Sequence, residues 1–452
     1  MEIIKMKDIE GYSERFAEFE KNAPGRDITW LKKLRQEAIT SFAELGFPTT
    51  RDEDWRFTNT APIARTSFQL SDNGHVRISQ KELESLTFLG LEYTQLVFVN
   101  GRYSEENSNL VHLPDRVKIL SLARAIEEQN DLLEEHLSRY ADHKKDAFLA
   151  LNTAFLEDGA LVYIPSGAVL EKPIQILYIS TEVDAPTMYH PRNLIVVGDN
   201  CEAIIVEHYA ALADSLYFSN AATEAVVGSN SVLRHHLVEC ESKKAFNIST
   251  LRVQQGRSSS VTSNSILLGG ALVRNNVHPV LAGEGSECFI NGLFMSTGRQ
   301  HMDNYMRVEH ASPHCDSRQL YKGVLDGRSR GVFHGRIIVH KDAQKTDAKQ
   351  TNRNLLLSDQ AQIDTKPQLE IYADDVKCTH GATIGQLDEN AIFYLRSRGI
   401  SLESARALLL FAFTSEILER IKVEPIRNYL EGLVKNWFIQ GKLIKKTEME
   451  IE

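Results

Sequence analysis

The residue pair in this chain that best resembles a metal-binding group is Cys378 and His380, separated by Thr379. In an extended strand, residues i and i+2 project from the same face, so the thiol and the imidazole are expected to lie side by side. Iron and zinc bind both groups, but their sites usually need four ligands. The pair therefore predicts either a buried structural cysteine or half of a metal site that a second chain completes.

A second group of possible ligands is His310, His314 and Cys315, in the segment HASPHCD. Thiolate and imidazole together suit iron, zinc or copper. However, Pro313 makes a helical i,i+4 arrangement improbable, and adjacent residues of a strand point to opposite faces. We therefore expect these three residues to be structural.

Motifs of self-sufficient catalysis are absent from the sequence. It has no GxxxxGK[ST] phosphate loop, no HExxH, no GxSxG and no pair of CxxC motifs. The net charge is -10 without a basic tract, which disfavours nucleic-acid binding. These absences predict a protein without catalytic residues and without a tightly bound cofactor of its own.

Cysteine usage and hydropathy indicate a reducing compartment. The five cysteines are odd in number and widely spaced, which argues against a disulfide framework. The first residues lack the apolar core of a signal peptide. The longest apolar run, 407–413, is far shorter than the roughly 20 residues that span a bilayer. We expect a cytoplasmic protein that has no membrane segment.

The first unit, residues 1–150, is predicted to be mainly helical. Apolar residues recur at helical spacing over 28–47, and Pro48 is expected to end that helix. The segment 118–140 has the same period and predicts a second helix.

The second unit, residues 151–397, is predicted to be a β-helix core. Short β-branched runs alternate with polar breaks, and no helical period returns before about residue 400. A weak repeat places glycines at intervals of 30, 28 and 27 residues, at positions 198, 228, 256 and 283. Such a period favours stacked coils, as in a β-helix, with a two-sheet sandwich as the alternative.

The third unit, residues 398–452, is predicted to be helical. Ser401 is a good N-cap with Glu403 in the first turn, and Pro425 suits the start of a second helix. The two helices carry much apolar surface. They either pack on each other or offer an apolar stripe to a partner protein.

Long segments of the chain resemble the SufB/SufD family, the paired subunits of the SUF iron–sulfur assembly scaffold. The resemblance covers about residues 151–430, including VKCTHGATIGQLDENAIFYLRSRGIS at 376–401, and RDEDWRFTN at 51–59 is similar to an N-terminal motif of the SufD branch. It implies a right-handed parallel β-helix between two helical regions, in agreement with the pattern of the sequence.

One position distinguishes the two branches. SufB-like chains carry a functional cysteine directly after Pro-x-x-Glu, where this sequence has Ile371 after Pro367 and Glu370. Ile371 can neither bind metal nor carry sulfur, so the resemblance indicates the SufD branch. In that branch the histidine that matches His380 is implicated in cluster assembly at the SufB–SufD interface. His380, with Cys378, is thus a candidate shared site for iron or a nascent cluster, held only transiently and within the complex.

The resemblance also implies partners. The family pairs SufD-type with SufB-like chains, and its C-terminal region docks a SufC-like ABC ATPase. An isolated chain with an unpaired sheet edge could also form a homodimer. The candidate ATPase-docking residues are Arg398, Gly399, Ser401, Leu408, Phe411, Phe413 and Glu416.

The sequence as a whole predicts a non-catalytic subunit of an iron–sulfur assembly complex. One alternative is a SufB-like scaffold that holds a cluster alone. A second alternative, of another class, is a β-helix polysaccharide-active enzyme that would use Asp364, Asp374 and Asp375 around calcium or a substrate.

Overall fold

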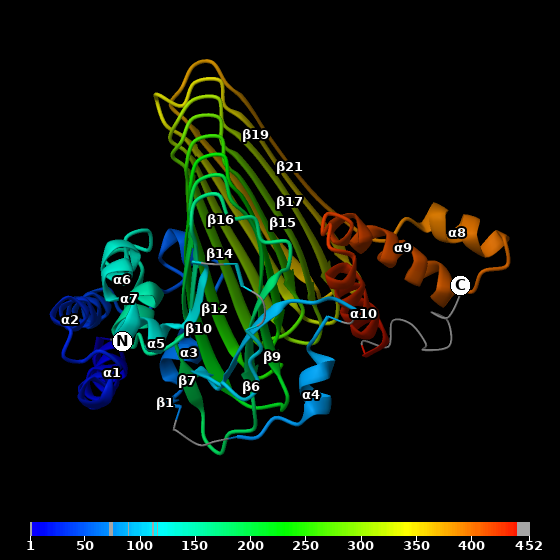
Figure 1. The fold of residues 1–452 in the computed structure, drawn as a ribbon. Coiled ribbons are helices and arrows are strands. Elements are labelled where there is room, and N and C mark those ends of the chain that lie inside the picture. The colour runs from blue at the N-terminus through cyan, green and yellow to red at the C-terminus, as the bar shows by residue number, and fades with distance from the viewer. Residues whose placement is uncertain (1, 72–75, 89, 111–112, 115, 441–452) are drawn as a thin grey trace.

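Two parallel sheets form a β-solenoid of about eight turns, with helices packed on its flanks, in the computed structural model shown in Figure 1. The structure describes residues 2–71, 76–88, 90–110, 113–114 and 116–440. Residues 441–452, which end the predicted third unit, lie outside this range. The predicted mainly β architecture with helical flanks is confirmed.

The two sheets, named here sheet A and sheet B, take up most strands of the described chain. Sheet A runs in the order β20 (Gln362–Ile371), β18 (Arg330–Val339), β16 (His301–His310), β14 (Leu272–Leu281), β12 (Phe246–Gln255), β10 (Tyr217–Val227), β8 (Arg192–Val197), β5 (Ala160–Ile164) and β4 (Lys118–Ser121), with β7 (Thr187–Tyr189) and β1 (Gln69–Leu70) off this path. Sheet B runs in the order β21 (Lys377–Gly385), β19 (Asp347–Leu356), β17 (Asp316–Leu325), β15 (Glu287–Ser296), β13 (Ser260–Leu267), β11 (Val232–Cys240), β9 (Glu202–Ala211), β6 (Ile174–Ser180), β2 (Thr94–Val99) and β3 (Arg102–Tyr103).

From β8 onward, successive strands alternate between the sheets, and each pairs in parallel with the strand two places later. Hydrogen bonds between stacked residues give the length of one coil. The backbone N–H of Cys201 donates to Ser231 Oγ, 30 residues ahead. His236 and Asn264 bond across 28 residues, and Asn291 bonds Asn264 across 27. These steps of 30, 28 and 27 residues confirm the repeat seen in the sequence. The sandwich alternative is wrong, because strands that alternate between two sheets and pair in parallel with the strand two places later form stacked coils.

The repeat glycines mark a corner of the coil where backbones stack closely. A Cβ on Gly283 would lie 2.1 Å from the backbone nitrogen of Arg257, and one on Gly228 would lie 2.6 Å from the backbone carbon of Gly198. Both distances are far below van der Waals contact, so no side chain fits. The glycines are therefore required by the close approach of successive turns.

The N-terminal region packs against the outer face of sheet A through a buried ion pair. Arg192 Nη2 lies 2.6 Å from Glu224 Oε1, and both side chains are fully buried. Arg192 also donates to Asn152, while the Glu224 carboxylate accepts three backbone N–H groups from 138–141. A buried ion pair stabilises a fold only when such bonds offset its desolvation. This network fixes the segment before β5 to the sheet.

The predicted helix over 28–47 is confirmed as α2, which ends before Gly46, a residue with φ of 64°. The continuous helix predicted over 118–140 is wrong. Lys118–Ser121 is strand β4, paired antiparallel with β5, and Gln129 has non-helical angles that separate two short helices. The helices of this region are α1 (Glu2–Asn22), α2 (Thr29–Leu45), α3 (Ala61–Arg65), α4 (Gln80–Ser85), α5 (Leu122–Glu128), α6 (Asn130–His136) and α7 (Ala147–Ala154).

Three helices follow the solenoid: α8 (Glu389–Ser397), α9 (Leu402–Leu418) and α10 (Glu424–Gln440). The predicted caps hold, since Ser401 Oγ accepts the N–H of Ser404 at the start of α9. The expectation of no helix before about residue 400 is wrong, because Asp388 caps α8. Its aromatic residues Phe393 and Tyr394 are exposed. No helix among the described residues is long and apolar enough to cross a membrane.

Two buried carboxyl groups lie at the end of β11, on Glu239 and Glu241. Burial raises the pKa of both, and the charge of Glu239 raises that of Glu241 further. Glu239 accepts the backbone N–H groups of Glu241 and Gly269, at 2.9 and 3.1 Å, which favours its ionised form. Glu241 is therefore the member of the pair that stays protonated to higher pH.

We expect Gly283→Ala to lower the free energy of unfolding by about 1–3 kcal/mol, because the added methyl group would separate two stacked turns. Urea denaturation followed by circular dichroism measures the change. Gly432→Ala in α10 is the matched control, since its Cβ would meet no atom within 4 Å. It should leave stability unchanged or raise it by up to about 1 kcal/mol. Equal stability of Gly283→Ala and wild type would contradict the stacking argument.

Glu241→Gln should make stability less dependent on pH. The folded-state pKa of Glu241 lies above that of the unfolded chain, so its stability contribution is full below about pH 4.3 and is lost as pH rises through the folded pKa. Between about pH 5 and pH 9, the free energy of unfolding should fall by at least about 1 kcal/mol less in the variant than in wild type, as measured by urea titrations. Glu419→Gln, which changes an exposed carboxylate, is the control. Parallel pH curves for wild type and Glu241→Gln would refute this assignment.

Candidate functional site

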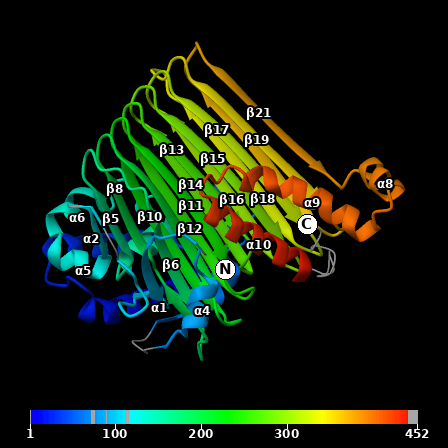
Figure 2. The same ribbon diagram turned by 45° about the vertical axis from the view of Figure 1, so that its right-hand side comes forward.

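The last coil of the solenoid is an open end. Among the described residues, β20 pairs with β18 alone in sheet A, and β21 pairs with β19 alone in sheet B. Most residues of both strands are exposed or half-buried, whereas the preceding strands are largely buried. Figure 2 shows β21 as the outermost strand of the stack. The far edges of both strands therefore present backbone groups that another chain can pair.

Cys378 and His380 lie on this open coil, in β21. The strand register places Cys378 beside Ala348 and His380 beside Gln350, and both of these neighbours are buried in the interior. Cys378 packs against the interior core and is half-buried, while His380 is exposed. The extended strand expected from the sequence is present. It sets the thiol and the imidazole on one row that has no further coil beyond it.

The pair does not form a complete metal site within this chain. No group of three or more His, Cys, Asp or Glu residues that could hold a metal ion occurs in the part of the chain that the structure describes. Burial raises the pKa of the Cys378 thiol, so a bound metal or a neighbouring positive charge would be needed to form the thiolate. The arrangement is that of an exposed imidazole and a half-buried thiol on the last strand of sheet B.

The other candidate group, HASPHCD, does not converge. His310 is buried, and its Nε2 lies 2.8 Å from Ser317 Oγ. Cys315 is buried in the core, with its thiol donating to the Gly283 carbonyl. His314 is exposed and has φ of 58°, in a column of left-handed turn residues. His310 and Cys315 are packed residues of the interior, as the sequence predicted, and exposed His314 does not join them in a group of possible ligands.

The three carboxylates that a polysaccharide-active enzyme would use do not gather into one site in the described chain. Asp364 accepts two bonds from Arg330, at 2.9 and 2.6 Å, and Asp375 pairs with Lys345. Asp374 is exposed on the turn after β20. At the position of the SufB-type cysteine, Ile371 ends β20 and is 40% exposed. Neither a calcium site nor a thiol is present at these positions.

The predicted docking residues divide into two groups. Lys322 of β17 binds Glu416 at 2.5 Å and the Phe413 carbonyl at 2.7 Å, and its Nζ lies 4.4 Å from the Phe413 ring centroid. Phe413 and Glu416 therefore anchor α9 to sheet B. Phe411 is half-buried beside Lys435. The exposed members of the predicted set are Arg398, Gly399, Ser401 and Leu408.

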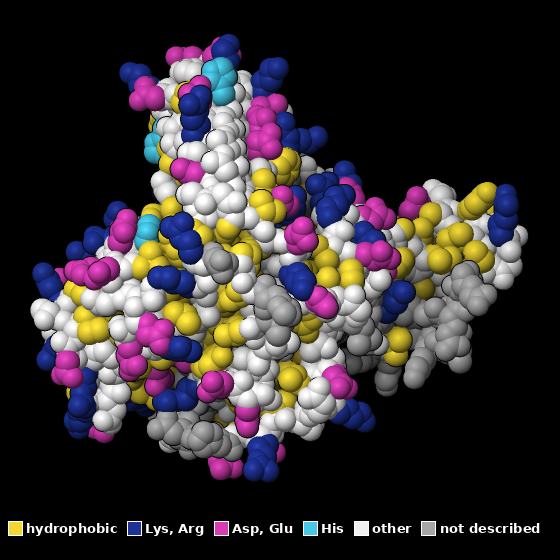
Figure 3. Space-filling model, in the orientation of Figure 1, with side chains coloured by type: hydrophobic (Ala, Val, Ile, Leu, Met, Phe, Trp, Pro, Cys, Tyr) yellow, Lys and Arg dark blue, Asp and Glu magenta, His cyan; other side chains and the backbone are white. Residues whose placement is uncertain are grey.

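Two exposed aromatic residues on α8 were not predicted from the sequence. Phe393 is 74% exposed and Tyr394 is 57% exposed, with Leu408 of α9 at 45%. Figure 2 shows α8 projecting away from the solenoid, and Figure 3 shows apolar side chains gathered over α8 and α9. Adjacent aromatic residues in a short helix cannot share one buried face, which is the signal that could have identified them.

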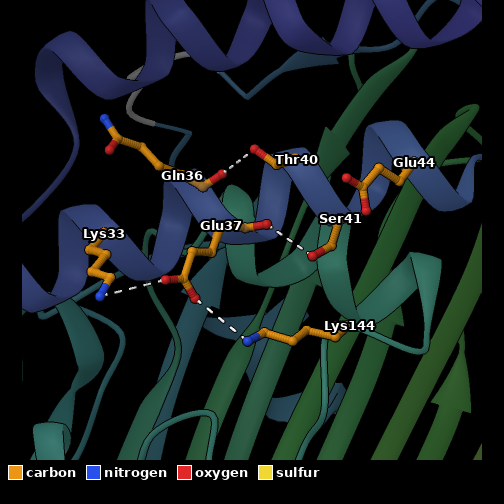
Figure 4. A pocket seen from close by; sticks show the side chains of 7 residues that line it. All are labelled: Lys33, Gln36, Glu37, Thr40, Ser41, Glu44 and Lys144. Atoms are coloured by element: carbon orange, nitrogen blue, oxygen red, sulfur yellow. Dashed lines mark hydrogen bonds and ion pairs between the residues drawn. The ribbon is translucent and has the colours of Figure 1, made fainter.

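A groove on α2, with a volume of about 530 Å³, is a weaker candidate (Figure 4). Glu37 lies at its centre and pairs with Lys33 at 3.8 Å and Lys144 at 3.9 Å. The charges balance within the groove and the side chains are largely exposed. Exposed pairs of this kind contribute little energy, so nothing in the groove is preorganised for a ligand.

Both parts of the chain match known protein families. Residues 6–176 match the family described as SufBD protein N-terminal region, and residues 178–413 match SUF system FeS cluster assembly, SufBD core domain. An iron–sulfur cluster assembly SufBD family protein of Synechocystis sp. is 34% identical over 418 residues, covering 91% of this chain and 92% of that protein. The iron–sulfur cluster assembly protein SufD of Escherichia coli is 32% identical over 394 residues, covering 87% of this chain and 89% of SufD.

A plant protein is similar over a comparable length. Protein ABCI7, chloroplastic, of Arabidopsis thaliana is 31% identical over 415 residues, covering 89% of this chain and 86% of its own. The matches include the solenoid with its open last coil and the N-terminal helices that cover sheet A. The chain therefore belongs to the SufB/SufD family of iron–sulfur cluster assembly proteins.

Proposed function

We propose that this chain is a non-catalytic, SufD-type subunit that pairs with a SufB-like paralogue and works with a SufC-like ABC ATPase to build iron–sulfur clusters. The observation that carries the proposal is the open last coil, on which Cys378 and His380 share the row of the buried residues Ala348 and Gln350 but have no further coil stacked on them. The 32% identity to a protein named SufD and the absence of a cysteine at Ile371 support the SufD-type role.

In this proposal, the partner pairs with the free strand edges of the last coil. The free edges of β20 and β21 can continue both sheets into a second solenoid, which a paralogue of the same fold would supply. A second copy of this chain could occupy the same edges when the paralogue is absent. Either arrangement would bury the exposed apolar residues Ile371, Tyr372 and Ile384.

The iron or nascent cluster is the cargo of this complex. His380 would contribute one imidazole ligand, with Cys378 beside it, and the SufB-like chain would bring the remaining ligands. Such a shared site loads and releases its cargo when the two chains separate. This chain alone is then expected to hold no cluster tightly, in contrast to the stand-alone scaffold alternative.

The ATPase would dock on the apolar surface of α8 and α9. Phe393, Tyr394 and Leu408 form an exposed apolar set next to Arg398, which donates to Tyr394 Oη at 2.7 Å. Aromatic and arginine side chains are typical of the energetic centres of interfaces. Because Lys322 fixes α9 to β17, movement of the ATPase would be transmitted to the solenoid.

We expect His380→Ala to lower the rate of cluster formation in the intact complex by about tenfold, the effect of losing one ligand contact. The measurement is anaerobic reconstitution with iron and sulfide, followed by absorbance and bound iron. Thr379→Ala is the matched control, because Thr379 lies on the opposite face of β21. Wild-type assembly by His380→Ala would reject the site but not the subunit role. Failure of the chain to co-purify with either partner would reject the subunit role.

Phe393→Asp should weaken ATPase binding by about thirtyfold, the effect of losing an aromatic anchor worth about 2 kcal/mol. Calorimetry with the purified ATPase measures the dissociation constant. Val169→Asp is the control, since Val169 is 57% exposed on a turn of the solenoid distant in sequence from α8. Unchanged binding by both Phe393→Asp and Leu408→Asp would place the docking surface elsewhere.

A further inference from the structure

The segment 50–62, here called the strap, crosses the outer face of sheet A and covers a cavity of about 340 Å³. The strap is held at three points. The Arg274 guanidinium lies 3.8 Å from the Trp55 ring centroid, Thr58 donates to Asp303 at 2.5 Å, and Glu53 pairs with Lys366 at 2.8 Å. These contacts extend from β14 to β20, so the strap is a fixed wall.

The floor of the cavity is one row of the solenoid. Phe246, Leu272, His301 and Arg330 are the first residues of β12, β14, β16 and β18, and the strand register stacks them in this order. The strap contributes the opposite wall with Arg56, Phe57 and Pro62, and Arg299 closes the side. The cavity is thus apolar in its depth and basic at its rim.

The charge in the cavity is positive and unbalanced. Three arginines line it, and none of the residues that line it is acidic. Asp364 neutralises Arg330, whereas Arg56 and Arg299 have no ion-pair partner among the described residues. Because the Thr58 hydroxyl donates to Asp303, His301 Nε2 is the donor to Thr58 Oγ1 at 2.9 Å, and burial lowers the pKa of His301. The guanidinium groups of Arg299 and of Arg56, which lies over the Phe57 ring, are thus the positive charges that no carboxylate neutralises.

We propose that this cavity is a binding site for a small aromatic phosphate. The Arg56 and Arg299 guanidinium groups would bind the phosphate, since planar guanidinium groups match its oxygens in geometry and charge. Phe57, Phe246 and Leu272 would contact the flat apolar body of the ligand. The volume lies at the lower end of the range of small-molecule sites and is too small for a folded partner. The proposal is independent of the cluster-assembly role.

Calorimetry with the full chain and naphthyl phosphate tests the proposal. We expect one site per chain, with binding at least about tenfold tighter than that of naphthol, inorganic phosphate or naphthoate. Arg56→Gln and Arg299→Gln should each weaken binding about tenfold, because each removes one charge-assisted contact. Arg51→Gln is the matched control, since Arg51 is exposed on the same segment but does not line the cavity.

A second variant tests the apolar part of the cavity without changing its charge. Ala271→Phe should fill the cavity and abolish binding of naphthyl phosphate. Circular dichroism establishes that each variant is folded before titration. Absence of saturable binding, equal binding of naphthol or naphthoate, or unchanged affinity in both arginine variants would overturn the proposal.

Discussion

The stacking of parallel coils through backbone hydrogen bonds is the constraint on which the rest of this structure depends. Each strand from β8 to β19 obtains its bonds from the coil before and the coil after it. At the amino end, antiparallel β3 and β4 end the two sheets, and the N-terminal helices cover sheet A. At the carboxyl end, β20 and β21 have no equivalent cap in the described chain. Among the described residues, the solenoid is therefore capped at one end only.

Helical segments cover the outer faces of the two sheets, and ion pairs as well as apolar contacts hold them there. The buried pair Arg192–Glu224 holds the N-terminal region on sheet A, and Lys322 holds α9 on sheet B. Both ties are supported by additional hydrogen bonds, which offset the cost of desolvating charge. The helices α9 and α10 then complete an apolar layer over sheet B, whereas α8 carries the exposed aromatic residues Phe393 and Tyr394.

The two candidate surfaces for the proposed function are the open last coil and α8. The open coil and α8 are adjacent in sequence, separated by the turn after β21, and one follows directly from the other along the chain. Lys322 anchors α9 through Phe413 and Glu416, and α8 lies between this anchor and the open coil along the chain.

The sequence by itself determined the class of fold, the coil period and the family. Glycines at corner positions and the regular alternation of strands are imposed by contacts between neighbouring coils, so they recur at a visible period. The strand of Cys378 and His380 was predictable for the same reason. The sequence could not show that 118–140 breaks into β4 and two helices, because pairing with β5 overrode the helical period. Only the tertiary structure decided that Phe413 and Glu416 are anchors, that Phe393 is exposed, and that the strap encloses a basic cavity. These properties depend on contacts between residues distant in the chain, and no local periodicity encodes such contacts.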